Sequence, residues 1–408
     1  MSDSAGSAEA VARASYGKLL ASMAARTGDV AGAEDALSEA FATALTEWPA
    51  RGVPDNPQAW ILTVARRKLI DAARRKRTSR EASTHLQLLA EEVAAEAEAD
   101  IPDDRLALMF VCAHRAIDPA VRAPLMLQTV LGLDAATIAS AFLTAPAAMG
   151  QRLVRAKARI KLTAIPFRLP ELADLPERLE AVLDAIYAAF SAGWTDPGGT
   201  ELSPRDLARE AIFLCRLVVS LLPDEPEALG LLALMLYAEA RRAARRTASG
   251  DYVPLDEQSV EAWDAALIEQ AEASLLRASA AGRVGRFQLE AAVQSAHVIR
   301  RRTGRSDWPA IVRLYDALAT LTGSPVVAIN RAVALAETSG AATALRQLDA
   351  LADDPRLVAY QPYWAARAVL LAGAAMTVEA KAAYQRAIGL EPDPAVRRFL
   401  SARLTALG

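Results

Sequence analysis

The sequence predicts an all-α protein, and its composition carries that prediction. Alanine occurs 92 times among the 408 residues, and aromatic residues make up 5% of the chain. Alanine has the highest intrinsic helix propensity, whereas β-strands favour the β-branched and aromatic residues that are scarce here. The 53% of apolar residues can build a large core, and the length indicates two or three domains.

Neither a membrane nor an oxidising compartment is indicated by the sequence. It contains no run of eighteen apolar residues, and no charged and then apolar signal peptide opens the chain. Cys112 and Cys215 form no C-x-x-C pair and no disulfide framework. We therefore expect a soluble protein of the reducing cytoplasm that has no membrane partner.

The net charge of −3 divides into four blocks along the chain. Residues 1–80 carry +3, residues 81–104 carry −8, residues 105–161 carry +6 and residues 162–408 carry −4. Two separated basic blocks suggest two contacts with a polyanion, for which nucleic acid is the first candidate. The alternative is the general preference of Lys and Arg for C-terminal helix turns. The cations concentrate at Arg66, Arg67, Lys68, Arg74, Arg75, Lys76, Arg77 and Arg80, and at Arg152, Arg155, Lys157, Arg159 and Lys161.

Residues 8–78 predict a first helical unit. Apolar residues at positions 33, 37, 40, 41 and 44 lie at helical spacing. They predict an amphipathic helix whose outer surface carries Glu34, Asp35 and Glu39. The segment from Trp48 to Asn56 is rich in proline and glycine and predicts a loop.

A further helix of this unit should begin directly after that loop. Asn56 is a suitable N-cap, and Pro57 is a suitable first helical residue. The helix then runs from Trp60 to Arg77, with an apolar first half and a cationic second half. Core packing is the favoured role for the Trp60 indole, and contact with a ligand is the alternative.

Residues 79–100 separate the first unit from a second one. They are acidic and have no strong apolar face, so we expect a linker with some helix. Residues 101–165 predict a second helical unit, in which Asp118 can cap a helix that begins at Pro119. Asp134 and Thr144 can cap two short helices that follow at helix-turn-helix spacing.

The second of these short helices has two distinct faces. At 100° per residue, the apolar residues 149, 153, 156 and 160 form a narrow stripe that should pack inward. The other side carries Gln151, Arg152, Arg155 and Arg159. Such a face suits a recognition helix in the major groove, where Gln and Arg bind base edges or phosphates. A generic helical pair with a solvated basic face is the alternative.

Residues 170–408 are mildly acidic, dense in Leu and Ala, and contain an internal repeat. The hexapeptide that begins at Arg331 matches the one that begins at Arg367, and the same offset relates positions 344 and 348 to 380 and 384. A period near 34 residues predicts tetratricopeptide-like helical hairpins, which stack into a concave surface for a protein or peptide. Chance alignment of alanine-rich helices is the alternative.

The residues form no catalytic constellation. His85, His114 and His297 are scattered, and no His-Glu-x-x-His, Gly-x-Ser-x-Gly or phosphate-binding glycine loop occurs. Cys112 and His114 are of ligand type, but a structural zinc ion needs four ligands and no second pair is near. We therefore expect no enzyme, no cofactor and no metal, and a buried role for Cys112.

Several segments carry a family resemblance that covers nearly the whole chain. Residues 35–41, 57–66 and Asp71 are similar to regions 2.2 to 2.4, and residues 131–142 and 149–157 to region 4, of extracytoplasmic-function (ECF) sigma factors of the sigma-70 superfamily. Residues 164–170, 222–236, 307–308, 324–334 and 398–400 resemble a subgroup with a long C-terminal tetratricopeptide-like extension. The chain departs from the usual pattern at Arg67, at Gly150 and in the segment 190–194.

The resemblance implies a role for each unit in transcription initiation. The helix with Glu34, Asp35 and Glu39 would bind the clamp helices of the β′ subunit of core RNA polymerase, with the β subunit as a further partner. The first basic unit would engage the minus-ten promoter element, and the second basic helix the minus-thirty-five element. The residues implied for the minus-ten element are Asn56, Arg66, Arg67, Lys68 and Arg74.

The C-terminal repeats would regulate this sigma factor, either by covering its DNA-binding surface or by receiving a partner. Two other functions stay open at this point. One is a stand-alone helix-turn-helix regulator that binds DNA without polymerase and carries a tetratricopeptide-like sensor. The other is an interaction scaffold whose basic faces are incidental.

Overall fold

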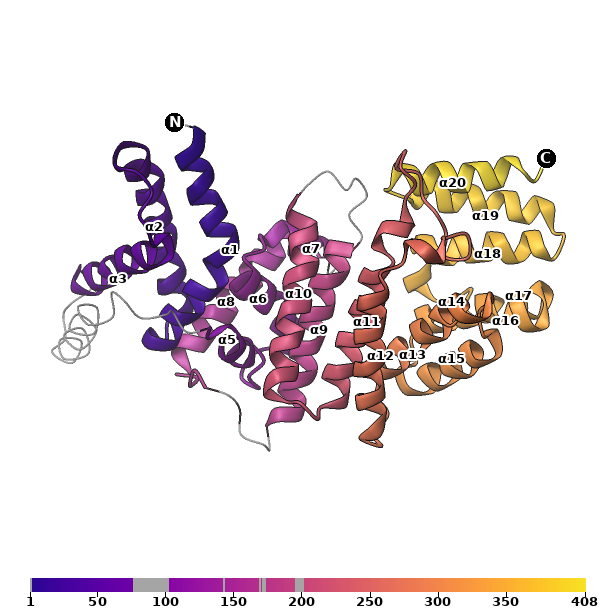
Figure 1. The fold of residues 1–408 in the computed structure, drawn as a ribbon, viewed down its shortest axis with the longest axis horizontal. Helices are drawn as coiled ribbons and strands as arrows, with labels where there is room; N and C mark the ends of the chain where they lie inside the picture. The colour runs from indigo at the N-terminus through magenta and orange to yellow at the C-terminus, as the bar shows by residue number, and fades with distance from the viewer. Residues whose placement is uncertain (1, 76–102, 142–143, 169, 171–173, 195–201) are drawn as a thin grey trace. The chain divides into compact units, whose positions relative to one another are not determined.

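A computed structural model describes residues 2–75, 103–141, 144–168, 170, 174–194 and 202–408. The chain forms two compact units, residues 1–192 (unit 1) and 193–408 (unit 2) (Figure 1). Across these described ranges the regular elements are helices, and the β-type pairing is one isolated bridge between Arg246 and Tyr252. The predicted all-α class is confirmed. Within the same ranges, no helix combines the length and apolarity that crossing a bilayer requires.

Three helices open unit 1 and pack against one another: α1 (Ser2–Thr27), α2 (Val30–Arg51) and α3 (Pro57–Arg75). The Asp29 carboxylate caps α2 by accepting the Gly32 N–H at 3.1 Å. The Asn56 side-chain oxygen accepts the Ala59 N–H at 3.1 Å, so the predicted start of α3 is confirmed. The apolar stripe of α2 is buried at Ala33, Leu37, Ala40 and Ala44, as its helical spacing predicts.

The predicted loop from Trp48 to Asn56 begins later than expected. Helix α2 continues through Pro49 to Arg51, and Gly52, with φ of +85°, ends it. A proline in the last turn removes a single backbone hydrogen bond, which is a small loss at this position. This small loss is offset by burial of the Trp48 side chain. Trp48 is 2% exposed and packs edge-on against Trp60, with ring centroids 5.5 Å apart.

The second half of unit 1 contains α5 (Arg105–Cys112), α6 (Pro119–Leu131), α7 (Ala135–Ala141), α8 (Pro146–Leu162) and α9 (Leu175–Trp194). Asp118 accepts the Ala120 N–H at 3.0 Å, and Asp134 accepts the N–H groups of residues 136 and 137, as predicted. The predicted Thr144 cap of α8 is wrong. Pro146 pushes the residue before it into an extended conformation, so Ala145 is the N-cap and supplies no side-chain hydrogen bond.

Helix α9 belongs to unit 1 because its first turn is bound to α5 and α6. The buried Arg178 guanidinium donates from Nε to the Phe110 carbonyl oxygen at 2.9 Å. Arg122 donates to Glu177 at 2.8 Å and to the Ile117 carbonyl at 3.1 Å. These contacts satisfy a backbone carbonyl near the end of α5 and one just before α6, and they hold the first turn of α9 against both helices.

Unit 2 is a succession of helices in which each longer helix packs against the next, with α13 contacting α15 past the short α14. This arrangement is typical of helical-repeat proteins, in which stability comes from adjacent repeats. Its elements are α10 (Leu202–Leu221), α11 (Pro226–Ala240), η1 (Arg242–Arg245), η2 (Val260–Ala262), α12 (Ala265–Ala280), α13 (Arg286–Val298), α14 (Arg300–Thr303), α15 (Trp308–Thr322), α16 (Pro325–Ser339), α17 (Ala341–Asp349), η3 (Pro355–Leu357), α18 (Gln361–Gly373), α19 (Thr377–Leu390) and α20 (Pro394–Thr405).

The two copies of the sequence repeat occupy equivalent places in this succession. Arg331 on α16 pairs with Asp316 on the preceding helix α15 at 2.5 Å. Arg367 on α18 pairs in the same way with Asp349 on α17, at 2.6 Å. The matched positions 344 and 380, and 348 and 384, are all buried. The offset of 36 residues is therefore a structural repeat.

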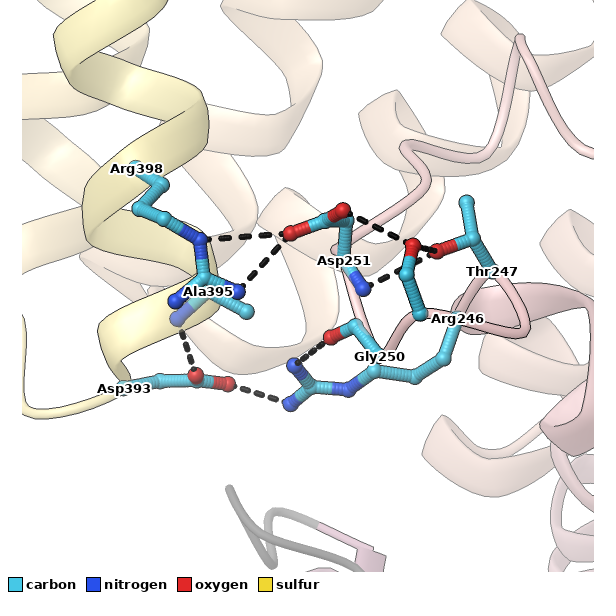
Figure 2. Close-up of polar contacts among 8 residues, drawn as sticks. Arg246, Thr247, Gly250, Asp251, Asp393, Ala395 and Arg398 are labelled. Atoms are coloured by element: carbon cyan, nitrogen blue, oxygen red, sulfur yellow. Dashed lines mark hydrogen bonds and ion pairs between the residues drawn. The ribbon is translucent and has the colours of Figure 1, made fainter.

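The irregular segment 246–257 lies along the last helix, α20 (Figure 2). Three ion pairs join them at donor–acceptor distances of 2.5 to 2.8 Å, and the Tyr252 ring packs edge-on against Phe399. Asp393 also accepts the Ala395 N–H at 2.8 Å, so one carboxylate caps α20 and holds the segment. The pairs are Arg246–Asp393, Asp251–Arg398 and Glu257–Arg403.

A pair of glycine substitutions tests the packing of unit 2. A β-carbon at Gly230 on α11 would lie 2.6 Å from the backbone nitrogen of Gln288 on α13. We expect Gly230→Ala to lower the free energy of unfolding by about 1–3 kcal/mol, because the two helices must move apart. Gly389 on α19 has no described heavy atom within 4 Å of such a β-carbon. Gly389→Ala should raise stability by about 0.5–1 kcal/mol. Urea denaturation followed by circular dichroism measures both, and equal effects would contradict the close crossing.

The two cysteines report separately on the two units. Cys112 in unit 1 and Cys215 in unit 2 are both buried, and burial raises the pKa of the Cys112 thiol to about 12 and the pKa of Cys215 as well. Because the thiolate is the nucleophile, we expect Ellman's reagent at pH 8 to react with the native protein at least about 100-fold more slowly than with the urea-denatured chain. Cys112→Ala and Cys215→Ala variants assign the two rates, and rapid labelling of either thiol in the native protein would contradict its burial.

Candidate nucleic-acid interface

Helix α8 has the two faces that its sequence predicts. The apolar stripe at Met149, Leu153, Ala156 and Ile160 is buried. It packs toward α6 and α7, which both contact this helix. The opposite face is exposed and carries the predicted DNA-binding residues Gln151, Arg152, Arg155 and Arg159. The tertiary structure therefore leaves a polar and cationic strip about two turns long on the surface of unit 1.

The first group of predicted DNA-binding cations lies on α3, and its side chains differ in exposure. Arg67 is exposed, Arg66 is half-buried, and Arg74 lies in the last turn of the helix. Lys68 makes an ion pair with Glu39 on α2 at 3.4 Å. One predicted DNA-binding side chain therefore contacts one predicted polymerase-binding side chain.

The loop before α3 offers fewer contacts than its composition suggests. Asn56 is exposed, but its side-chain oxygen caps α3 and is committed to the Ala59 N–H. The Trp48 indole is buried in the core and cannot stack on a base. The favoured core role of Trp60 agrees with its contact with Trp48. The predicted linker 79–100 and the cations Lys76, Arg77 and Arg80 lie outside the described residues.

The three acidic side chains of α2 differ in their exposure to solvent. Asp35 and Glu39 are exposed, as the helical periodicity predicts. Glu34 is not on the free outer surface: its side chain is 14% exposed and accepts a 2.5 Å ion pair from Lys157 of α8. Burial raises the pKa of the Glu34 carboxyl, and the Lys157 charge opposes this increase. Periodicity identifies the face that a helix buries in its own bundle, but it does not show what covers the other faces.

A second ion pair joins the same two helices. Lys161 of α8 contacts the Asp29 carboxylate, whose other oxygen caps α2. Sequence reasoning did not single out Asp29 as part of a site. The spacing of Lys157 and Lys161, four residues apart on one helix, does place both cations on one side of α8. Their acidic partners lie more than 120 residues away in the chain, so no local pattern could pair them.

Helix α1 makes a close contact with α6 beside these ion pairs. A β-carbon at Gly17 would lie 1.8 Å from the carbonyl oxygen of Val130, so residue 17 must be glycine for this approach. The Tyr16 ring lies against Gly132, which ends α6 with φ of +69°. Burial raises the pKa of the Tyr16 hydroxyl, and the nearby Glu34 charge raises it further. The helices α1 and α2 are thus packed against α5, α6 and α8 within one compact unit.

Cys112, the last residue of α5, and His114, two residues later, have structural contacts. The buried Cys112 sulfur lies 3.6 Å from the Thr129 hydroxyl, and the His114 Nδ1 accepts the Ala116 N–H at 3.1 Å. Partial burial, and after it the charges of neighbouring arginines, lower the pKa of His114. No three or more His, Cys, Asp or Glu side chains of the described ranges gather in a way that could hold a metal ion. The predicted buried role of Cys112 is confirmed.

Comparison with known proteins identifies two segments and one long relative. Sigma-70 region 2 matches residues 12–79, which include α2 and α3. A family of unknown function (DUF6596) matches residues 178–279, which begin on α9 and end on α12. Uncharacterized protein R00370 of Rhizobium meliloti (strain 1021) is 39% identical over 383 residues, which cover 92% of this chain and 90% of that protein. No solved structure matches this chain.

One of these matches covers almost the whole chain, and the others cover single segments. The long relative shares almost the whole chain, so its similarity includes both compact units. The matched region 2 implies core RNA polymerase and promoter DNA as partners, because these are the partners of sigma-70 proteins. The chain therefore belongs to one family with the Rhizobium meliloti protein, and its residues 12–79 carry a match to sigma-70 region 2.

Proposed function

We propose that this protein is an ECF-type sigma factor that directs core RNA polymerase to specific promoters under the control of its C-terminal helical unit. The observation that carries the proposal is the exposed Gln and Arg face of α8, in a chain whose residues 12–79 match sigma-70 region 2. A region 2 alone accounts for one promoter contact. The second basic helix supplies the second contact that promoter recognition at two elements requires.

Helix α8 has the dimensions and chemistry of a recognition helix. It spans 17 residues, or about 25 Å, and its buried stripe rests on the helices before it. Arg152 and Arg155 project from the same exposed side as Gln151. The major groove admits an α-helix, in which Arg binds guanine edges and Gln binds adenine edges. This geometry supports a role for α8 at the minus-thirty-five element.

The basic half of α3 is the proposed contact with the minus-ten element. Opening of a duplex requires cations that hold the displaced backbone and pockets or rings that hold the bases. Arg67 is exposed, Arg66 and Lys68 on either side of it are half-buried, and Arg74 follows in the last turn of α3. Since Trp48 is buried, base stacking would have to use groups other than this indole.

The acidic residues of α2 are the proposed contact with polymerase. Asp35 and Glu39 are exposed on a helix whose other face is buried, which suits a basic coiled-coil partner such as the β′ clamp helices. The β subunit is the proposed partner of the second half of unit 1. An acidic linker at residues 79–100 would be repelled by DNA phosphates and could pass through the core enzyme.

Unit 2 is the proposed regulatory part. Its equivalent repeats, with matching Arg–Asp pairs at Arg331 and Arg367, support a tetratricopeptide-like array that receives a protein or peptide. A stand-alone regulator would bind promoter DNA without polymerase, and a scaffold would bind neither. Neither of these proteins would support promoter-dependent transcription by core polymerase in the first experiment below.

The first test of the proposed function is transcription by purified core polymerase on a pooled library of randomised upstream sequences, with sequencing of the transcript 5′ ends. We expect the full chain to select promoters. The Arg152→Ala/Arg155→Ala variant should start at them at least about tenfold less often and with relaxed upstream base preference, since each bidentate contact contributes about 1–3 kcal/mol of discrimination. Arg301→Ala/Arg302→Ala removes the same charge from exposed residues of unit 2 and should change neither result. A lack of promoter-dependent transcription with the full chain would refute the proposal.

The second test concerns the acidic helix. We expect Asp35→Lys/Glu39→Lys to weaken binding to core polymerase at least about tenfold at 0.15 M salt, because like charges at an interface repel. Fluorescence anisotropy of labelled protein titrated with core enzyme measures the affinity. The matched control, Glu337→Lys/Asp353→Lys, reverses two exposed acids of unit 2. Equal losses in both variants would assign the effect to net charge and contradict a specific contact of α2.

A further inference from the structure

We propose that unit 2 binds a small oxyanion, the phosphate or carboxylate group of a soluble ligand, between Arg241 and Arg300. Arg241 follows the last residue of α11, and Arg300 is the first residue of α14. The site uses no residue of the promoter and polymerase contacts proposed for unit 1, so the inference stands apart from the sigma function. It is carried by the acceptors of the two guanidinium groups, by the charges around them and by two buried polar atoms beside Arg300.

Backbone and ring contacts bring both arginines next to Trp263. The Asp264 N–H donates to the Ala240 carbonyl oxygen at 2.9 Å, so the residues that follow η2 and α11 lie together. The Arg300 guanidinium lies over the Trp263 ring, with its central carbon 5.3 Å from the ring centroid. Helix α14 also contacts η2, and η2 contacts η1. The end of α11, where Arg241 lies, therefore meets η2 and α14 at one place.

Both guanidinium groups donate to neutral acceptors. Arg241 donates to the Gln294 side-chain oxygen at 2.5 Å and to the Tyr237 carbonyl oxygen at 3.3 Å. Arg300 donates to backbone carbonyl oxygens of the segment 256–258 at 2.9 and 2.8 Å. Within the described ranges, neither arginine makes an ion pair with a carboxylate. Arginine binds phosphate and carboxylate oxygens more strongly than neutral ones, so an oxyanion would be the preferred acceptor at this place.

The charged groups around Arg241 are cations. Burial, and after it the charges of Arg245 and Arg300, lower the pKa of Arg241 to about 10. Burial, and after it the charges of Arg241 and Arg300, lower the pKa of His297 to about 4, so this imidazole is neutral at pH 7. Like charges that are partly removed from water destabilise one another. An oxyanion between Arg241 and Arg300 would reverse this repulsion.

The nearest carboxylates are bound to other arginines. Glu239, two residues before Arg241, accepts from Arg242 at 2.7 Å. Asp393 accepts from Arg246 at 2.5 Å, as Figure 2 shows. These two acids are therefore committed to other guanidinium groups, and the counter-charge for Arg241 would come from a ligand.

Two buried polar atoms beside Arg300 have no hydrogen-bond partner among the described residues. They are Nε1 of Trp263, which is 4% exposed, and Oε1 of Gln258, which is 8% exposed. The other amide atom of Gln258, Nε2, donates to the Val253 carbonyl oxygen at 3.2 Å. Buried polar atoms are almost always hydrogen-bonded. Hydrogen phosphate has oxygens that accept from the indole N–H and a hydroxyl that donates to the amide oxygen, so its chemistry matches both atoms.

Isothermal titration calorimetry of the full chain with inorganic phosphate and with succinate, at constant ionic strength set by sodium chloride, tests the site. We expect one phosphate per chain, and weaker binding of succinate, which has no hydroxyl for Gln258. Arg241→Gln should weaken phosphate binding at least about tenfold, because it removes a charge-assisted contact. The matched control is Arg216→Gln. Arg216 also donates to a glutamine, Gln270, at 2.8 Å, but it is exposed on α10, and its loss should leave phosphate binding unchanged.

A second variant removes one donor and keeps the aromatic ring. Trp263→Phe retains a ring beneath Arg300 but lacks the Nε1–H, so phosphate binding should weaken at least about threefold, as expected for one hydrogen bond. Circular dichroism checks that each variant has the helix content of the parent chain. If Arg241→Gln does not fold, the parent chain and Trp263→Phe decide the outcome.

Saturable phosphate binding by the parent chain that weakens in the site variants and not in Arg216→Gln supports the oxyanion site. Saturable binding of succinate alone, with the same response to the variants, also supports the site and assigns its ligand to the carboxylates. The absence of saturable binding of either probe up to about 10 mM would overturn the inference. Equal affinity in the parent chain and in every folded site variant would overturn it as well, because the anion would then bind elsewhere.

Discussion

The burial of α1 between two groups of helices is the constraint on which unit 1 depends. Helix α1 contacts α2 and α3 of the first half of the unit and α5 and α6 of the second half. Leu19, Leu20 and Met23 are consequently buried, and Gly17 allows the backbones of α1 and α6 to approach. Residues 19–24 of α1 are all buried, so this part of the helix is covered around its whole circumference. This burial joins two segments, each with its own basic surface, into one compact body.

The polar contacts at this junction set the relation between the candidate sites. Lys157 and Lys161 belong to the helix with the Gln and Arg face, and their partners Glu34 and Asp29 belong to the start of the acidic helix α2. Removal of one partner from a buried ion pair commonly costs about 3–5 kcal/mol, because the remaining charge is left without water or counter-charge. Two ion pairs therefore join the helix with the Gln and Arg face to the start of the acidic helix α2.

Unit 2 shows how far local sequence can predict a structure and where it stops. The repeated hexapeptide predicts two equivalent helices. The structure adds that Arg331 and Arg367 make equivalent ion pairs with the preceding helices. Neighbour-to-neighbour packing makes such repeats visible in sequence. The contacts between segment 246–257 and α20 join residues 147 positions apart, and no periodic pattern in the sequence predicts these contacts. The DUF6596 match likewise crosses from α9 of unit 1 into unit 2, which composition did not indicate.

Taken alone, the sequence determined what depends on near neighbours: the all-α class, the caps at Asn56, Asp118 and Asp134, and the two faces of α8. These follow from propensity, capping and a period of 3.6 residues. Tertiary structure decided what depends on distant partners. Trp48 is held in a helix by burial against α3, and Glu34 is withdrawn from solvent by a lysine 123 residues away. The physical reason is that a local pattern encodes which side of an element is apolar, whereas the partner of each charged side is chosen when the elements pack together.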